Sequence, residues 1–309
     1  MSHFADRWIG RALRVRSRVV VGLDPEVERF PAQLRQRLKD EPTEERLEET
    51  LFEFNRAVIE ASAGEAVGFK PQVAFYEQYG TAGHVALRRT IMLLRDMGLP
   101  ILLDGKRNDV AHTARAYGIA WLGREHPVFG TPNPWRADAL TINGYLGRDG
   151  VAPFQEVNRE AGLFVLAKTS NPSSGELQDL ALASGETVAE RMALLAESWG
   201  EGTIGTHGFG NVGIVVGATY PAHAGRLREL APHALFLMPG IGAQGGSLEA
   251  VTRAAGFNGV GAYAAASRGV MYPFKPGEIS GPGWRGEVMT RVAAAAKALR
   301  EAVNGALPG

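Results

Sequence analysis

A short segment of alternating charge contains the residues of this sequence that are best suited to chemistry. Residues 101–110 read Ile-Leu-Leu-Asp-Gly-Lys-Arg-Asn-Asp-Val, which places Asp104, Lys106 and Asp109 directly after an apolar run. Asp104 and Lys106 are two positions apart at an expected strand end, so both side chains can point to one side. Because nearby carboxylates favour the charged form of a lysine, we expect Lys106 to be a fixed cation and a proton donor. A structural salt-bridge network with an aspartate helix cap is the alternative interpretation.

Other polar residues stand at the ends of apolar runs, where they could complete this group of charges. Lys70 ends the second run, and its ammonium group could extend the chain of alternating charges at Asp104. Asp24 follows the first run, Ser170 lies just after the fifth, and Asp109 is expected at the start of the helix after the third. In a parallel barrel the active site lies at the carboxyl ends of the strands, so these side chains would converge there.

Two loops near the end of the sequence have the composition of a phosphate site. Residues 239–246 contain four glycines and Gln244, so the backbone can approach a ligand closely and present its N–H groups. Arg268, in a Ser-Arg-Gly segment, adds a guanidinium group suited to bidentate phosphate binding. Glycine-rich turn chemistry beside a surface arginine is the alternative. The loops after the last two strands of a barrel commonly hold phosphate, which favours the first interpretation.

Short apolar runs alternate with longer segments of helical periodicity, and these elements must position the polar residues. The expected strands are nearly continuous in hydrophobicity, as is typical of parallel strands covered on both faces. They are Val19–Leu23, Ala66–Lys70, Ile101–Asp104, Ala139–Ile142, Leu163–Ala167, Ile214–Gly217, Leu235–Met238 and Gly259–Ala264. Eight such repeats predict an α/β fold, a (β/α)8 TIM barrel. An open doubly wound sheet is the alternative, but no dinucleotide-binding fingerprint follows the first strand.

The helical segments complete a single barrel domain over residues 1–309. The expected helices are Glu44–Ala61, His84–Met97, Thr113–Leu122, Val188–Ser198, Ala222–Leu230, Leu248–Ala255 and Glu287–Val303. An apolar stripe predicts a short N-terminal helix that covers one end of the barrel. The stripe consists of Phe4, Trp8, Ile9, Ala12 and Leu13. The charged segment 25–42 and the proline-rich segment 125–136 interrupt the pattern, and we expect insertions there rather than domain boundaries.

Composition argues against several classes of function. Lys and Arg together number 33, as do Asp and Glu, and this zero net charge argues against nucleic acid as a partner. The absence of cysteine excludes disulfides, Cys-ligated metals and thiol nucleophiles, and it fits a cytoplasmic protein. No apolar run approaches the ~18 residues of a membrane span, so we expect no membrane partner. The histidines show no metal-ligand spacing, and no serine lies in a nucleophile elbow.

The charged segment and the loops together resemble one enzyme family. Leu103–Val110, followed by Thr113, is similar to the D-x-K-x-x-D-(I/V)-x-x-T signature of orotidine 5'-monophosphate decarboxylases. The other matching positions stand in the family's order, namely Gly22-Leu23-Asp24, Lys70, Ser170-Asn171-Pro172, residues 239–246 and Ser267-Arg268-Gly269. The resemblance covers residues ~19–275 and is closest in form to the longer bacterial branch. The sequence departs from the commoner pattern at Asn108, where many members have Gly, and in the order Ser-Arg-Gly.

The resemblance implies decarboxylation of orotidine 5'-monophosphate to uridine 5'-monophosphate without metal or cofactor. It assigns to Lys106 the stabilisation of the carbanion at C6 of the orotate ring and the delivery of the replacing proton. Asp104 would lie near the departing carboxylate. Lys70 and Asp109 would hold Lys106 and contact ribose hydroxyls, and Asp24 would make similar contacts.

The same resemblance assigns substrate-binding residues and an assembly. Ser170 would contact the pyrimidine edge. Gln244 and Arg268 would bind the phosphate group, whose remote binding energy helps to close loops over the ring. In this family the residues at Asp109 and Thr113 reach the active site of the partner subunit, which implies a homodimer.

Two alternatives from other functional classes use the same residues. Mg²⁺-dependent phosphosugar lyases on the same barrel share the D-x-K-x-x-D spacing, but they typically place another acidic metal ligand on the second strand. This sequence has the cation Lys70 there, which would repel Mg²⁺. The second alternative is a non-catalytic barrel that binds a phosphorylated ligand as a sensor, a function that needs no dense chain of charges.

Overall fold

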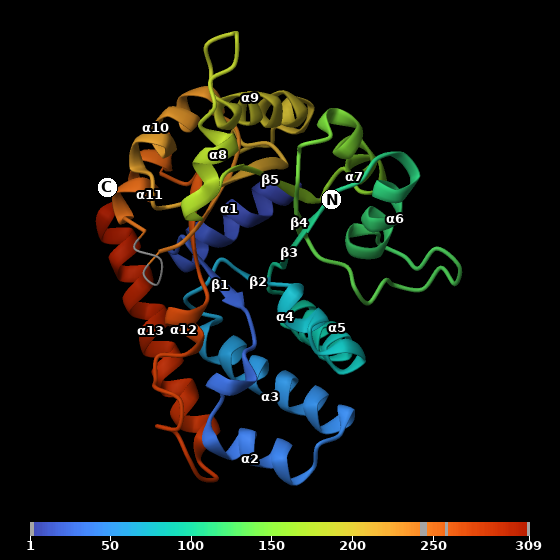
Figure 1. Ribbon diagram of the computed structural model, residues 1–309, viewed down its shortest axis with the longest axis vertical. Helices are drawn as coiled ribbons and strands as arrows, with labels where there is room; N and C mark the ends of the chain where they lie inside the picture. The colour runs from blue at the N-terminus through green and yellow to red at the C-terminus, as the bar shows by residue number, and fades with distance from the viewer. Residues whose placement is uncertain (1–2, 242–245, 257–258, 308–309) are drawn as a thin grey trace.

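The computed structural model describes residues 3–241, 246–256 and 259–307, and its centre is a barrel of parallel strands (Figure 1). The strands are β1 (Val19–Leu23), β2 (Gly68–Pro71), β3 (Leu102–Arg107), β4 (Ala139–Ile142), β5 (Gly162–Lys168), β6 (Val212–Val216), β7 (Phe236–Pro239) and β8 (Ala262–Ala266). Hydrogen-bonded neighbours follow the order β2-β1-β8-β7-β6-β5-β4-β3, and each pair is parallel. Isolated parallel bridges from Phe69 to Ile101 and from Gln72 to Asp104 join β2 to β3 and close the barrel. The predicted (β/α)8 barrel is therefore confirmed.

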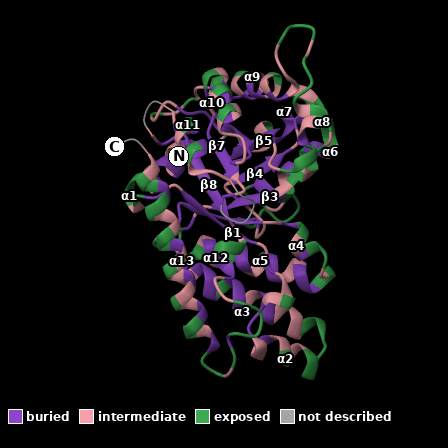
Figure 2. Cartoon of the chain, turned by 60° about the vertical axis from the view of Figure 1, so that its left-hand side comes forward, coloured by how far each residue is buried: buried purple, intermediate pink, exposed green. Residues whose placement is uncertain are grey.

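Helices surround the strands, and the longer ones carry exposed residues on the side away from the barrel (Figure 2). The longer ones are α1 (Phe4–Val15), α2 (Ala32–Asp40), α3 (Glu44–Ser62), α5 (Gly80–Asp96), α6 (Ala111–Leu122), α9 (Val188–Gly200), α10 (Pro221–Leu230), α11 (Leu248–Ala254) and α13 (Trp284–Ala306). The shorter α-helices are α4 (Ala74–Glu77), α7 (Ala152–Val157), α8 (Gly175–Gln178) and α12 (Arg268–Met271). The 3-10 turns are η1 (Val27–Arg29), η2 (Gly147–Gly150), η3 (Pro172–Ser174) and η4 (Glu201–Thr203).

Alternating strand residues face two separate apolar layers. Val20 lies in the barrel interior, whereas its neighbours Val19 and Val21 pack outward against the surrounding helices. The other strands contribute to the interior layer in the same way, through residues that include Leu102, Ala139, Phe164, Val215, Leu237 and Tyr263. Because of this alternation, the next inward-facing residues of β2, β3 and β4 lie nearer the carboxyl end of the barrel, and their side chains are polar.

Helix α1 covers the barrel interior at the amino-terminal end of the strands. The ring of Phe4 meets that of Phe164 edge-on at a centroid distance of 6.0 Å, and Trp8 meets Tyr263 at 5.6 Å. A Cβ atom at Gly162, the first residue of β5, would lie 2.4 Å from the Phe4 ring, so this close approach requires glycine. The opposite end of the strands is left open for a site.

Several element boundaries differ from the predicted ones because backbone pairing continues beyond the apolar runs. Strands β1 and β4 have the predicted bounds, but β3 runs on to Arg107, whose carbonyl accepts a hydrogen bond from Asn143 N–H at 3.0 Å. The segment 25–42, expected to be an insertion, contains η1 and α2. Leu34 is the one buried residue of α2, so the sequence lacks the apolar periodicity that would have indicated this helix. Leu13, predicted on the buried stripe of the first helix, is 49% exposed.

Candidate active site

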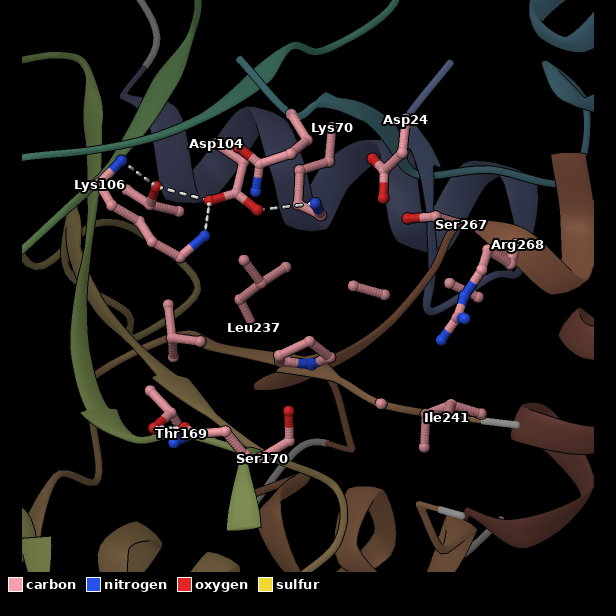
Figure 3. Close-up of a pocket in the computed structure, with 18 of the residues that line it drawn as sticks. Asp24, Lys70, Asp104, Lys106, Thr169, Ser170, Leu237, Ile241, Ser267 and Arg268 are labelled. Carbon is pink, nitrogen blue, oxygen red and sulfur yellow. Dashed lines mark hydrogen bonds and ion pairs between the residues drawn. The ribbon is translucent and has the colours of Figure 1, made fainter. Parts of the chain in front are cut away.

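A cavity of about 360 Å³ opens at the carboxyl ends of the strands (Figure 3). This volume lies in the range of small-molecule sites. Its polar lining includes Asp24, Lys70, Asp104, Lys106, Thr141, Thr169, Ser170 and Arg268. Its apolar lining includes Leu166, Val215, Leu237 and Ile241. Figure 3 shows the charged group on one side of the cavity and Thr169 and Ser170 across from it. The structure therefore combines a charged reaction centre with an apolar wall that could receive a ring.

Asp104 lies between two ammonium groups. Its Oδ1 is 2.6 Å from Lys106 Nζ, and its Oδ2 is 2.7 Å from Lys70 Nζ. Asp104 and Lys70 are buried, whereas the side chain of Lys106 is 45% exposed toward the cavity. Burial by itself would raise the pKa of Asp104, but the two ammonium groups hold that pKa well below its usual range. Asp104 is therefore a permanent anion at neutral pH that fixes the position of the Lys106 nitrogen.

Asp24 extends the chain of charges beyond Lys70. Burial would lower the pKa of Lys70, but the carboxylates of Asp104 and Asp24 raise it. The pKa of Asp24 is raised because burial disfavours its charged form, which Lys70 and a hydrogen bond with Ser267 offset only in part. Asp24 Oδ1 is buried and accepts no hydrogen bond from the described residues. An unpaired oxygen at a cavity wall is suited to accept a hydrogen bond from a ligand hydroxyl group.

The backbone of Lys106 adopts the left-handed region, which residues other than glycine rarely adopt. Its φ angle is +45°, and the pairing register of β3 and β4 shifts at this point. The hydroxyl group of Thr141 on β4 accepts a hydrogen bond from Lys106 N–H at 3.0 Å and donates one to Asp104 Oδ1 at 2.9 Å. Thr141 is 1% exposed. One buried hydroxyl group therefore holds both the strained backbone and the carboxylate that fixes the ammonium group.

The residues predicted to bind base and phosphate come from three other loops. Ser170 follows β5 and lines the cavity, as does Arg268, the exposed first residue of α12. Gln244 lies outside the described residues. Gly240 and Ile241, from the same glycine-rich loop, line the cavity. The structure thus brings Arg268 and the start of this loop to the cavity that contains the charged chain.

Asp109 and Thr113 do not line this cavity, although the sequence places them in the same motif. Asp109 lies in the segment between β3 and α6, where its Oδ1 accepts a hydrogen bond from Val110 N–H at 2.8 Å. Helix α6 begins at Ala111, two residues after Asp109, so the carboxylate precedes the helix that was expected to start there. Thr113 lies in the first turn of α6, and both residues are half-buried.

Sequence reasoning assigned no role to Lys168, the last residue of β5. Its side chain is 1% exposed, and its Nζ donates to both carboxylate oxygens of Asp179 at 2.8 and 2.9 Å and to Ser174 Oγ at 3.1 Å. These contacts fasten the segment that carries Ser170 to the end of β5. A charged residue closing an apolar strand is the signal that could have identified Lys168, since the same signal identified Lys70.

Groups that could hold a metal ion and helices that could span a membrane are both absent from the described residues. In the part of the chain that the structure describes, no three His, Asp or Glu side chains form a group that could hold a metal ion. Within the ranges 3–241, 246–256 and 259–307, no helix has both the length and the apolar character needed to cross a bilayer.

Comparison with known proteins places this barrel in a family. The model of the orotidine 5'-phosphate decarboxylase / HUMPS family matches residues 17–276. The orotidine 5'-phosphate decarboxylase of Rhodopirellula baltica is 43% identical over 282 residues, which cover 91% of this chain and 92% of that protein. The enzyme of the same name from Deinococcus radiodurans is 40% identical over 309 residues, 98% of each chain. The structure of Leishmania donovani OMP decarboxylase matches with a TM-score of 0.72 and 32% identity over 99% of both chains. The resemblance seen in the motifs is confirmed, and the chain belongs to the orotidine 5'-phosphate decarboxylase / HUMPS family.

Proposed function

We propose that this protein decarboxylates orotidine 5'-monophosphate to uridine 5'-monophosphate, a step of pyrimidine biosynthesis. The observation that carries this proposal is the chain of Lys106, Asp104 and Lys70 at the cavity. It is supported by the 40–43% identity to curated orotidine 5'-phosphate decarboxylases over nearly the whole length of the chain. A lysine held in place by a carboxylate suits a reaction in which negative charge develops on a carbon atom.

The reaction breaks the bond between C6 of the pyrimidine ring and the carboxyl carbon. The electron pair of that bond stays on C6, carbon dioxide leaves, and a proton from Lys106 Nζ forms the new C6–H bond. Because Asp104 already holds the ammonium group beside the cavity, little reorganisation is needed when the charge develops. The side chain of Lys106 is 45% exposed, so solvent can return the proton after each turnover.

The remaining cavity residues suit the other parts of the substrate. Arg268 would bind the phosphate group, because a guanidinium group forms paired hydrogen bonds with phosphate oxygens. Gln244 would also bind the phosphate group. Ser170 would contact the edge of the pyrimidine. Asp24, with its unpaired buried oxygen, and Lys70 would contact the ribose hydroxyls. The phosphate contacts would supply binding energy at a distance from the reacting carbon.

The proposal also places the enzyme in the cytoplasm. The chain contains no cysteine, which fits a reducing compartment where disulfides do not form.

The activity can be tested directly with the purified protein. EDTA-treated enzyme is mixed with orotidine 5'-monophosphate, and the pyrimidine absorbance is followed. We expect metal-independent conversion to uridine 5'-monophosphate. Turnover that requires Mg²⁺ would support the phosphosugar-lyase alternative. The position of Lys70 on β2 argues against that alternative, because the additional acidic metal ligand would be expected on this strand. Binding without turnover would support the sensor alternative.

A pair of lysine variants tests the assignment of Lys106. Lys106→Ala should lower kcat by at least ~10²–10³, the scale for losing one preorganised electrostatic group. The matched control is Lys297→Ala, because Lys297 is 60% exposed on α13 and pairs with Glu301 in a surface contact. A folded Lys106→Ala enzyme with wild-type kcat would remove this residue from the mechanism.

We further propose a homodimer in which Asp109 and Thr113 contribute to the active site of the partner subunit. Neither residue lines the cavity of its own subunit. Val110 follows Asp109 directly and is 41% exposed, and Tyr145 and Leu146 are 74% and 40% exposed. Leu146 lies close to Asp109, since a Cβ atom at Gly150 would be 3.2 Å from Leu146 Cβ and 3.4 Å from the Asp109 carbonyl oxygen. Exposed apolar surface of this kind is typical of an interface between subunits.

Mixing two inactive variants tests this shared site. Lys106→Ala and Asp109→Ala homodimers should each be inactive. Subunit exchange should produce mixed dimers in which one site has both native residues, restoring about a quarter of the wild-type sites for a statistical C2 dimer. Sedimentation of the protein as a monomer, or mixtures that stay inactive although mass spectrometry detects mixed dimers, would contradict the shared site.

A further inference from the structure

A second cavity, of about 570 Å³, lies at the amino-terminal end of the barrel, opposite the candidate active site. Its walls are α1, the segment 98–100 that leads into β3, and the segment 136–138 that leads into β4. Since β3 and β4 carry Asp104 and Thr141 toward their other ends, the two cavities are separated by the length of the strands. The mechanism of decarboxylation uses no residue of this second cavity.

Five arginines line the second cavity. Arg7, Arg11 and Arg14 are spaced four and three residues apart on α1, which places their side chains on one face of the helix. Arg95, in the last turn of α5, and Arg136, just before β4, face them from the other walls. Like charges at this helical spacing destabilise a helix, so α1 carries a repulsion that its own residues do not relieve.

The carboxylates of the cavity do not neutralise this charge. Asp6 and Asp138 are its two lining anions, which leaves an excess of three positive charges. Asp138 is engaged by Arg7 at 2.9 Å and by the N–H of Ile101 at 2.9 Å. Asp6 accepts hydrogen bonds from the N–H groups of residues 206 and 207. Both carboxylates are therefore largely committed to the fold.

The guanidinium groups have donors left for a ligand. Arg11 donates hydrogen bonds to the carbonyl oxygens of Ala63 and Ala66. Arg95 donates one to the carbonyl oxygen of Asn133. These carbonyl groups carry no net charge, so the contacts do not neutralise the guanidinium groups. The guanidinium groups of Arg14 and Arg136 have no hydrogen-bond or ion-pair partner among the residues that the structure describes, although both line the cavity. An arginine side chain stays charged under all ordinary conditions, so the repulsion persists until an anion enters.

The effect of this crowding is visible at the half-buried Arg136. Burial lowers the pKa of its guanidinium group, and the neighbouring Arg95, Arg124 and Arg7 lower it further, while Asp138 opposes them. The pKa of Arg11 is lowered by burial and by Arg14. The cluster thus holds its charge at a cost, which an anionic ligand would remove.

We propose that this second cavity binds a small polyphosphate anion, of the class that includes inorganic tripolyphosphate and the triphosphate group of nucleotides. Several guanidinium groups on three walls favour a ligand with several phosphate groups, each able to accept paired hydrogen bonds. A volume of about 570 Å³ accommodates such a ligand. Because the ligand would join α1 to the segments before β3 and β4, binding should stabilise the folded protein.

Isothermal titration of the full chain with sodium tripolyphosphate tests the proposal. We expect binding that weakens with added salt and a Tm that rises by a few degrees at saturation. The double variant Arg14→Gln/Arg136→Gln should bind at least about tenfold more weakly. Arg253→Gln is the matched control, because Arg253 is 53% exposed on α11 and pairs with Glu249; its affinity should equal that of the wild type.

A third variant distinguishes the two cavities. Arg268→Gln removes the guanidinium group that lines the candidate active site and should leave tripolyphosphate binding unchanged. Loss of binding in Arg268→Gln would overturn the proposal, since the anion would then occupy the other cavity. Wild-type affinity in a double variant with a native circular dichroism spectrum would overturn it as well, as would binding of polymeric RNA without binding of tripolyphosphate. None of these measurements depends on the decarboxylase activity.

Discussion

Replacing Thr141 with valine removes the hydroxyl group that links Lys106 to Asp104 and keeps the shape of the side chain. In the native structure this hydroxyl group accepts from Lys106 N–H at 3.0 Å and donates to Asp104 Oδ1 at 2.9 Å. The valine variant therefore loses one hydrogen bond to a charged group and leaves the backbone N–H of Lys106 without its partner. Since the side chain is 1% exposed, water replaces these contacts poorly.

The size of the effect follows from these two contacts. A hydrogen bond to a charged group contributes about 1.5–3 kcal/mol. If that energy holds the ammonium group in its reactive position, the barrier to decarboxylation rises by a similar amount and kcat falls by roughly 10–100-fold. KM should change little, because the proposed phosphate-binding groups, Arg268 and the glycine-rich loop, follow other strands. The free energy of unfolding should fall by about 1–3 kcal/mol, since a buried N–H loses its acceptor.

Steady-state decarboxylation rates and urea unfolding of three proteins provide the test, namely the wild type, Thr141→Val and Thr141→Ser. The serine variant retains the hydroxyl group, so it should recover most of kcat even where it loses some stability. This split separates positioning of Lys106 from general packing of the barrel. A valine variant with kcat within about twofold of the wild type would refute the reasoning, and so would a serine variant as slow as the valine variant.

Three further predictions concern the surroundings of Lys106. Arg268→Ala should raise KM and lower kcat/KM by about 10–100-fold, because it removes charged contacts to the phosphate; unchanged steady-state kinetics would place the phosphate elsewhere. Lys168→Met should lower the free energy of unfolding in urea by about 1.5–3 kcal/mol, because the three hydrogen bonds of its buried ammonium group are lost. An unchanged value would mean that Asp179 contributes nothing through them. The lowered pKa of Asp104 means that the unfolded chain takes up its proton first as pH falls. The ionised Asp104 therefore contributes its full stabilisation above the ordinary aspartate pKa of 3.8, and this contribution is lost as pH falls below that value. The difference in unfolding free energy between wild type and Asp104→Asn should thus be smaller at pH 3 than at pH 5. A constant difference would contradict this reasoning.

The sequence was sufficient where a single element determines the outcome. Strands β1 and β4 could be placed residue by residue, because each is a continuous apolar run. The contact of Lys106 with Asp104 was predictable from their spacing on one strand. Helix α2 was missed because it buries Leu34 and little else, so it lacks the apolar periodicity by which helices are recognised.

The role of Thr141 could not be predicted, because it depends on how two strands are aligned. Thr141 is 37 residues from Asp104 in the sequence, and they meet only through the register of β3 against β4. Thr141 lies within the predicted strand Ala139–Ile142, but nothing in the sequence indicates which residues of the neighbouring strand lie beside it. The left-handed backbone at Lys106 was equally hidden, since that position favours glycine and the sequence has lysine.

The shared carboxylate explains why the site uses two lysines rather than one. If Asp104 paired with Lys106 alone, the pair would be neutral and its field at the reacting carbon would be weak. Because Lys70 engages the other oxygen of the same carboxylate, Asp104, Lys106 and Lys70 together carry one positive charge. The carboxylate of Asp24 beyond Lys70 offsets that charge when it is ionised, and its raised pKa widens the pH range in which it is neutral. Burial keeps Lys70 and Asp104 away from solvent screening, whereas the exposed side chain of Lys106 reaches the cavity. In the proposed mechanism Lys70 would therefore maintain the charge that Lys106 presents, and the nitrogen of Lys106 would deliver the proton.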